Sequence, residues 1–144
     1  MRVKDCMCKK VVQATSDTTL DKIAQLMQEN DVGCVPICNE EKNVIGFVTD
    51  RDIITRCVAT NQSCSQTKAS DIMTTKVIKT TPDTEIDEAT NTMSHNQIRR
   101  LPVIENNQIV GMLTIGDLAQ SQKVQPREVG DTMECICKCN HHQE

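Results

Sequence analysis

The chain contains an internal repeat, and this repeat restricts the possible folds more than any other feature of the sequence. Residues 5–38 align with residues 71–104 without a gap. After a length difference of one residue in a turn, residues 46–52 align with residues 111–117. Agreement at so many positions in the same order is not expected by chance. The 144 residues are therefore expected to fold as two copies of one structural unit.

Each copy is predicted to begin with a strand and a helix. The β-branched runs Val11-Val12 and Val77-Ile78 indicate an initial buried strand in each copy. Apolar residues at helical spacing then predict a helix with one buried face. These residues are Leu20, Ile23, Ala24 and Met27 in the first copy, and Ile86, Ala89 and Met93 in the second.

Two strands and a second helix complete each copy. Apolar runs joined by polar turns predict strands at Cys34–Cys38 and Val44–Thr49, and at residues 101–104 and 109–114. A second helix is expected to start near Asp50 and near Ile115. Each copy is therefore a β-α-β-β-α unit, and the chain belongs to the mixed α/β (α+β) class.

The repeat divides the chain into four segments. Residues 1–60 form the first copy, the polar residues 61–68 a linker, residues 69–122 the second copy, and residues 123–144 a Cys- and His-rich tail. A copy of about 50 residues buries too little apolar surface to be stable alone. We therefore expect the copies to pack sheet to sheet with pseudo-twofold symmetry, and clefts where they meet are natural ligand pockets.

Composition argues against several kinds of partner. The formal net charge is −4, and the chain has one Phe and neither Trp nor Tyr. A nucleic-acid partner is not expected, because the chain lacks a basic surface and aromatic rings for base stacking. No stretch approaches the roughly 20 apolar residues of a membrane span. Nine cysteines without an export signal indicate a reducing, cytoplasmic location.

Sequence motifs of catalysis are also absent, so an enzyme is not expected. The chain has no phosphate-binding Gly-rich loop and no Gly-x-Ser-x-Gly elbow. Its histidines, His95, His141 and His142, lie outside any nucleophile–base pattern. Cys57 and Cys64, on the predicted second helix and in the linker, do not form a Cys-x-x-Cys redox motif.

Three motifs occur in both copies. They are Thr-x-x-Asp at the end of a strand (Thr49 and Asp52; Thr114 and Asp117), the strands Val35-Pro36-Ile37 and Leu101-Pro102-Val103, and Asp-x-Met openings at 5–7 and 71–73. Over residues 3–120 the chain resembles the tandem CBS-domain pair, or Bateman module. The resemblance implies a regulatory module that binds an adenosine compound (AMP, ADP, ATP or S-adenosylmethionine) in clefts between the repeats. It also implies a homodimer. A module without an effector domain of its own would act on a partner protein, and no cofactor besides the ligand is required.

The duplicated Thr-x-x-Asp motif has two interpretations. A carboxylate accepts two hydrogen bonds, so Asp52 and Asp117 can bind the vicinal hydroxyls of a ribose, with Thr49 and Thr114 at the same rim. The resemblance favours this interpretation. Alternatively, the motif is a capping box that satisfies backbone N–H groups at a helix start. Both can hold, the first with ligand bound and the second without it.

Positive charge for a phosphate is available at Arg51, Arg99 and Arg100. Their counterparts in the other copy are uncharged, so the two clefts are not expected to be equivalent. The alternative is that these arginines are solvated surface charges. A purine is expected between apolar side chains that are otherwise core residues. These are Val11, Val32, Val77 and Ile98.

The tail carries three thiols and two imidazoles within eight residues: Cys135, Cys137, Cys139, His141 and His142. Such a set can supply four ligands for Zn²⁺ or Cu(I). The alternative is a disordered, reduced tail. The leading hypothesis is therefore a sensor of an adenosine compound, and the second is a metal- or redox-responsive protein in which the repeats serve as a scaffold.

Overall fold

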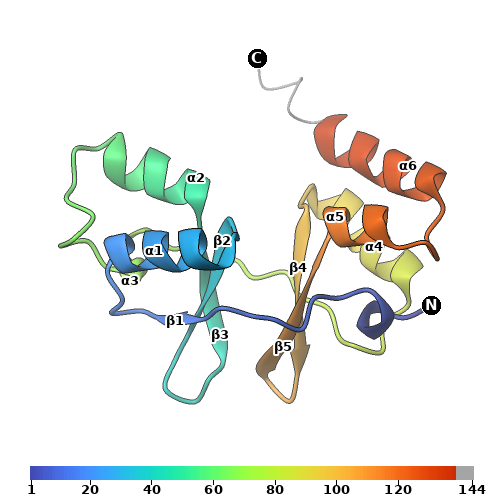
Figure 1. Ribbon diagram of the computed structural model, residues 1–144, viewed down its shortest axis with the longest axis horizontal. Coiled ribbons are helices and arrows are strands. Elements are labelled where there is room, and N and C mark those ends of the chain that lie inside the picture. Colours follow the sequence, from blue (N-terminus) through green and yellow to red (C-terminus); the bar gives the residue numbers. More distant parts are fainter. Residues whose placement is uncertain (139–144) are drawn as a thin grey trace. The chain divides into compact units, whose positions relative to one another are not determined.

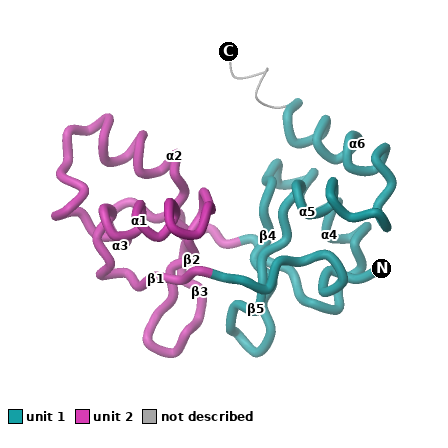
Figure 2. Tube along the Cα trace, in the orientation of Figure 1, with its two compact units in different colours: residues 1–11, 78–144 teal, residues 12–77 magenta. Residues whose placement is uncertain are grey.

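The computed structural model describes residues 1–138, which form two compact units (Figure 2). Unit 2 contains residues 12–77, and unit 1 contains residues 1–11 together with the chain from residue 78 onward. Each unit therefore joins the body of one sequence repeat to the opening segment of the other repeat. None of the helices in the described chain is long and apolar enough to cross a membrane.

Unit 2 has the predicted β-α-β-β-α order (Figure 1). Its elements are β1 (Ala14–Thr15), α1 (Leu20–Asn30), β2 (Cys34–Cys38), β3 (Val44–Thr49), α2 (Asp50–Ile53), the π-helical turn η2 (Ile54–Val58) and α3 (Ala69–Ile72). The sheet order is β1-β2-β3, with β1 parallel and β3 antiparallel to β2. Beyond α3, Thr74 exchanges two backbone hydrogen bonds with Phe47 of β3, at 2.9 and 2.8 Å. The opening segment of the second repeat thus extends this sheet.

The apolar stripe predicted for α1 is confirmed at three of its four positions. Leu20, Ile23 and Met27 are buried in the core of unit 2. Ala24 was expected to be buried and is exposed, whereas Leu26 is partly buried against the core. The longer Leu26 side chain removes more apolar surface from water than Ala24 would, which favours this rotation of the helix.

Unit 1 is built in the same way around a hairpin. Its elements are η1 (Val3–Asp5), α4 (Ile86–Asn96), β4 (Arg100–Glu105), β5 (Gln108–Thr114), α5 (Ile115–Gln120) and α6 (Pro126–Cys137). The antiparallel strands β4 and β5 are joined by Asn106 and Asn107, whose φ angles of 52° and 64° suit a tight hairpin turn. The predicted stripe of α4, Ile86, Ala89 and Met93, is buried. Both units are therefore mixed α/β, as predicted.

The strands predicted at Val11-Val12 and Val77-Ile78 are wrong. These four residues have no strand pairing and are only partly buried. They lie where the chain leaves one unit and enters the other. Pairing begins further along, at Ala14 in β1 and at Thr80, whose parallel bridge to Val103 is the counterpart of β1. Ala14 and Thr80 are the first buried residues of their segments, so they start the alternation of a strand.

The predicted linker and part of the predicted tail pack against their units. In residues 61–68, the carbonyls of Cys64 and Thr67 accept hydrogen bonds from the N–H groups of Asp21 and Leu20 at the start of α1, at 3.1 and 3.0 Å. In the tail, α6 packs against α4 and α5 and buries Ile136. A disordered tail is therefore excluded for Pro126–Cys137.

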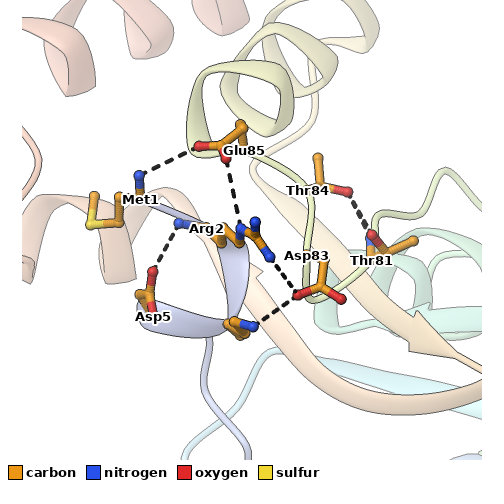
Figure 3. Close-up of polar contacts among 8 residues, drawn as sticks. Met1, Arg2, Asp5, Thr81, Asp83, Thr84 and Glu85 are labelled. Atoms are coloured by element: carbon orange, nitrogen blue, oxygen red, sulfur yellow. Dashed lines mark hydrogen bonds and ion pairs between the residues drawn. The ribbon is translucent and has the colours of Figure 1, made fainter.

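The first residues of the chain are held to unit 1 by backbone and side-chain contacts (Figure 3). The N–H of Val3 donates to the carbonyl of Thr84 at 2.9 Å. Lys4 Nζ and Arg2 Nη1 lie 2.8 and 3.2 Å from Asp83 Oδ1. The hydrogen bond from Lys4 and the two nearby positive charges lower the pKa of Asp83. The first residues of the chain, η1 included, thus contribute ion pairs as well as core packing.

Each sheet has one glycine where a neighbouring backbone segment passes too close for a side chain. A Cβ on Gly111 of β5 would lie 2.9 Å from the carbonyl oxygen of Cys8 and 2.9 Å from Met7 Sδ. A Cβ on Gly46 of β3 would meet Thr74 O and Met73 Sδ at the same distances. Met7 and Met73 are equivalent in the repeat, so the close contact is made twice.

We expect Gly111→Ala to lower the free energy of unfolding by about 1–3 kcal/mol, because a backbone carbonyl cannot yield as a flexible side chain can. Urea unfolding followed by circular dichroism measures the effect. Gly130→Ala on α6 is the control, since a Cβ there meets nothing within 4 Å. It should stabilise the helix by up to about 1 kcal/mol. Equal stability of Gly111→Ala and the unmodified protein would contradict the close contact.

Candidate functional site

Thr114 and Asp117 form one polar site at the point where β5 passes into α5. Thr114 Oγ1 accepts the N–H of Asp117 at 3.0 Å, and Asp117 Oδ2 accepts the N–H of Thr114 at 2.8 Å. The pair is a capping box, so the structural interpretation of Thr-x-x-Asp is confirmed here. Asp117 is partly exposed, and its Oδ1 has no hydrogen-bond or ion-pair partner within residues 1–138. That oxygen is therefore available to a ligand.

Two arginines lie beside this pair in unit 1. The carbonyl of Arg99 accepts the N–H of Ile115 at 3.0 Å, and Arg100 lies directly opposite Thr114 in the β4–β5 ladder. Side chains at opposed positions of an antiparallel pair have Cβ atoms about 5 Å apart. Arg99 and Arg100 are exposed and form no ion pair with any residue up to 138. Unit 1 thus combines a free carboxylate oxygen with two unpaired guanidinium groups.

The equivalent pair in unit 2 has the same capping geometry. Thr49 Oγ1 accepts the N–H of Asp52 at 3.0 Å, and Asp52 Oδ2 accepts the N–H of Thr49 at 3.1 Å. The Asp52 carboxylate has further partners, however. Arg56 Nε lies 3.8 Å from Oδ1, and the Thr74 hydroxyl donates to Oδ2 at 3.4 Å. With 9 % of its surface exposed, Asp52 is less available to a ligand than Asp117.

Sequence differences between the repeats explain this asymmetry. Arg56 is four residues after Asp52 and lies on the same side of the helix, whereas the matching residue after Asp117 is Ser121. The hydroxyl of Thr74 is replaced by the thiol of Cys8 in unit 1. Arg56 and Thr74 were not recognised from the sequence. The spacing of Arg56 was a usable signal, but the position of Thr74 depends on the exchange of opening segments between the units.

The remaining predicted ligand residues are placed as follows. Arg51 on α2 is exposed, and its side chain has no ion pair among residues 1–138. Val32 and Ile98 pack at the edges of the cores of unit 2 and unit 1. Val11 and Val77 are partly buried at the ends of their units. The purine and Arg51 assignments stay predictions.

The structure describes only part of the predicted metal site. Cys135 is exposed and Cys137 partly buried, both on α6. Residues two apart on a helix do not face each other, so these thiols do not converge while α6 is helical. Up to residue 138, no three Cys, His, Asp or Glu side chains cluster as metal ligands. The other three predicted ligands, Cys139, His141 and His142, lie outside the described residues.

Comparisons with known proteins agree on one family. The CBS domain family model matches residues 3–59 and 69–123. The CBS domain-containing protein YhcV of Bacillus subtilis is 34% identical over 140 residues, which cover 97% of this chain and 98% of YhcV.

Two solved structures are similar over most of the chain. Hypoxic Response Protein I with two coordinated zinc ions has a TM-score of 0.76 and 31% identity, and the match covers 83% of this chain and 98% of the other. The CBS domain pair of MJ0100 in complex with 5-methylthioadenosine and S-adenosyl-L-methionine has a TM-score of 0.74 and 26% identity, with 83% and 94% covered. With two family matches over most of its length, the chain belongs to the CBS-domain family as a tandem CBS pair.

Proposed function

We propose that this protein is a regulatory, non-catalytic sensor of an adenosine compound whose principal site is in unit 1. Asp117 binds the ribose hydroxyls through its free Oδ1, and the Thr114 hydroxyl donates a further hydrogen bond at the same rim. Arg99 and Arg100 bind the phosphate, because guanidinium groups form strong paired hydrogen bonds with phosphate oxygens. The observation that carries the proposal is the free carboxylate oxygen of Asp117 in a unit where two unpaired arginines adjoin Thr114 and Ile115 through their backbone.

A similar protein supports this ligand class. The MJ0100 pair was crystallised with 5-methylthioadenosine and S-adenosyl-L-methionine, which share an adenosine moiety. A vicinal diol is the feature of adenosine that a carboxylate recognises best, since the lone pairs of a carboxylate can accept both hydroxyl donors. The contact between the ribose and Asp117 is therefore the best-supported part of the proposal. Arginine is needed only if the group attached to the 5′ carbon is a phosphate.

The equivalent site of unit 2 is proposed to bind ligand more weakly. A ribose at Asp52 has to displace Arg56 or Thr74, which already interact with the carboxylate. Displacement leaves a charged or polar partner without its contact, and that loss reduces the net affinity. Occupancy of one site before the other follows from this difference.

The proposal is tested by replacing both arginines. In Arg99→Ala/Arg100→Ala we expect AMP to bind at least about tenfold more weakly, because two charge-assisted contacts to phosphate are lost. Adenosine has no phosphate, so its affinity should change little. Isothermal titration with both ligands measures the difference.

Arg127→Ala is the matched control, because Arg127 is also exposed and forms no ion pair among residues 1–138, but lies on α6 and is not a candidate ligand residue. Its AMP affinity should stay within about threefold of the unmodified protein. Equal weakening of AMP and adenosine in the double variant would show that the arginines support the fold rather than bind phosphate. An unchanged AMP affinity would remove them from the site.

A second copy of the chain is the proposed structural partner. Ile54 and Val58 are 60 % and 56 % exposed, an unusual degree for large apolar side chains, and they are four residues apart on η2. Such a pair loses exposed apolar surface when it meets its equivalent in a homodimer.

An effector protein would bind differently to the ligand-bound and ligand-free forms of this dimer. A ligand can shift that state only through unequal affinity for two arrangements.

A further inference from the structure

Cys57 and Cys64 lie in direct contact, although seven positions separate them in the sequence. Their sulfur atoms are 3.3 Å apart. Cys57 is fully buried on η2, and Cys64 is partly buried in the turn that follows. The chain reverses between them through Asn61, whose φ angle is 59°, and the N–H of Gln62 donates to the carbonyl of Cys57 at 3.0 Å. The fold has therefore brought two thiols together with little need for further movement.

Two other closely spaced pairs of cysteines are not placed in this way. Cys34 and Cys38 stand at opposite ends of β2, about 13 Å apart at the rise of an extended strand. Cys135 and Cys137 diverge on α6 because residues two apart on a helix do not face each other. A bond within either pair requires the strand or the helix to break, whereas one between Cys57 and Cys64 requires only that two touching sulfurs approach.

We propose that Cys57 and Cys64 are a redox modification site that forms a reversible intramolecular disulfide with low-molecular-weight disulfides as oxidants. The Cys64 thiolate, the more exposed of the two, attacks one sulfur of the oxidant and displaces a thiolate. The Cys57 thiolate then attacks Cys64 Sγ and displaces the second. The protein loses two electrons and two protons, and the oxidant gains both as two free thiols. A dithiol reverses the reaction.

The bond would join two parts of unit 2 that position other groups. The carbonyl of Cys64 accepts the N–H of Asp21 at the start of α1. The neighbour of Cys57, Arg56, donates from Nη1 to the carbonyl of Ile72 at 2.8 Å and forms the ion pair with Asp52. The disulfide therefore links η2, which contains Arg56, covalently to the loop that caps α1. This link stabilises the arrangement in which Arg56 is paired with Asp52.

The surroundings of Cys64 set the rate of this reaction. Its hydrogen bond with Cys57, together with burial and the negative charge of Asp21 on α1, raises the pKa of Cys64. Less thiolate is present at neutral pH than for an ordinary thiol, and the thiolate is the nucleophile. The rate of disulfide formation is therefore expected to rise with pH over a range above the one in which an ordinary thiol titrates.

Tryptic mapping of the unmodified protein tests the proposal directly. Cleavage after Arg56 and Lys68 releases peptide 57–68, which contains Cys57, Cys64 and none of the other seven cysteines. Peptides 5–9 and 128–138 each contain two cysteines as well and serve as internal controls. The protein is equilibrated with glutathione buffers of increasing oxidised fraction, alkylated, digested and analysed by mass spectrometry.

We expect peptide 57–68 to lose two hydrogens and escape alkylation at an oxidised-to-reduced ratio at least about tenfold lower than either control peptide. The bond should also raise the unfolding temperature by roughly 5 °C. Cys64→Ser should show neither change. Oxidation of peptide 57–68 in parallel with the controls, or glutathione adducts on it in place of the internal bond, would overturn the proposal.

Discussion

Val3→Asp is expected to lower the free energy of unfolding by about 3 kcal/mol or more, because it places an unpaired carboxylate in an apolar core. Val3 is 0 % exposed and packs in the core of unit 1 with Leu101 and Leu113, which are distant in the sequence. Its N–H already donates to Thr84, so the new side chain cannot move outward without breaking that bond. Urea unfolding followed by circular dichroism measures the loss.

Two control variants distinguish the cost of burying a carboxylate in the core from the cost of losing apolar atoms and from the cost of adding a carboxylate anywhere. Val3→Ala removes only apolar atoms and should cost about 2 kcal/mol. Ala24→Asp adds a carboxylate at an exposed position of α1 and should cost less than about 1 kcal/mol. Hydrogen exchange should show the loss of protection mainly in residues 78–138 rather than in 12–77. A Val3→Asp variant as stable as Ala24→Asp would mean that the first residues do not belong to unit 1.

The second large effect is expected on ligand affinity. Asp117→Asn should weaken binding of an adenosine compound by roughly tenfold to a hundredfold, because one charged acceptor for the ribose becomes an amide N–H₂ donor. The amide oxygen can still accept the N–H of Thr114, so the cap of α5 and the fold should remain. Isothermal titration measures affinity, and thermal unfolding verifies that the variant is folded.

Asp52→Asn is the matched control, since it makes the same change at the equivalent position of unit 2. In the unmodified protein the Asp52 carboxylate already interacts with Arg56 and Thr74. We therefore expect less than about threefold loss of affinity but a larger loss of stability than in Asp117→Asn, because a partly buried charged contact is weakened. If Asp117→Asn binds as the unmodified protein does, the ribose assignment fails. If Asp52→Asn loses more affinity, the principal site is in unit 2.

Elements with a strong local pattern could be predicted from the sequence. The strands Cys34–Cys38 and Val44–Thr49 have the predicted bounds, and the helices that follow start at Asp50 and Ile115. Each rests on hydrophobic periodicity or a capping motif within a few residues, which short-range physics determines. The repeat gave the family resemblance, and the CBS family match confirms it.

Features that depend on distant partners could not be predicted. The runs Val11-Val12 and Val77-Ile78 have the composition of strands, but no backbone partner lies beside them. Met7 contacts Gly111, and Met73 contacts Gly46. An alignment of the repeats does not show this exchange, because each copy has a methionine and a glycine at these two positions. Only the folded chain shows which copy each segment completes.

The candidate site shows the same division between local and distant information. Thr114 and Asp117 were identified together because a capping box is a local motif. The pairing of Arg100 opposite Thr114 follows from the hairpin register, which the short turn at Asn106 and Asn107 sets. The contact of Cys57 with Cys64 depends on a reversal of the chain direction between them, and no sequence motif predicts that reversal. The contact was therefore not predicted, although both cysteines were noted in the sequence.

Isothermal titration of the reduced, metal-free protein with AMP, ATP and S-adenosylmethionine tests the central claim most directly. The account predicts saturable binding of at least one of these compounds with micromolar affinity, and competition by adenosine for the same site. Absence of measurable binding for all three, in protein that unfolds cooperatively and is therefore folded at the start, would contradict a sensor of adenosine compounds.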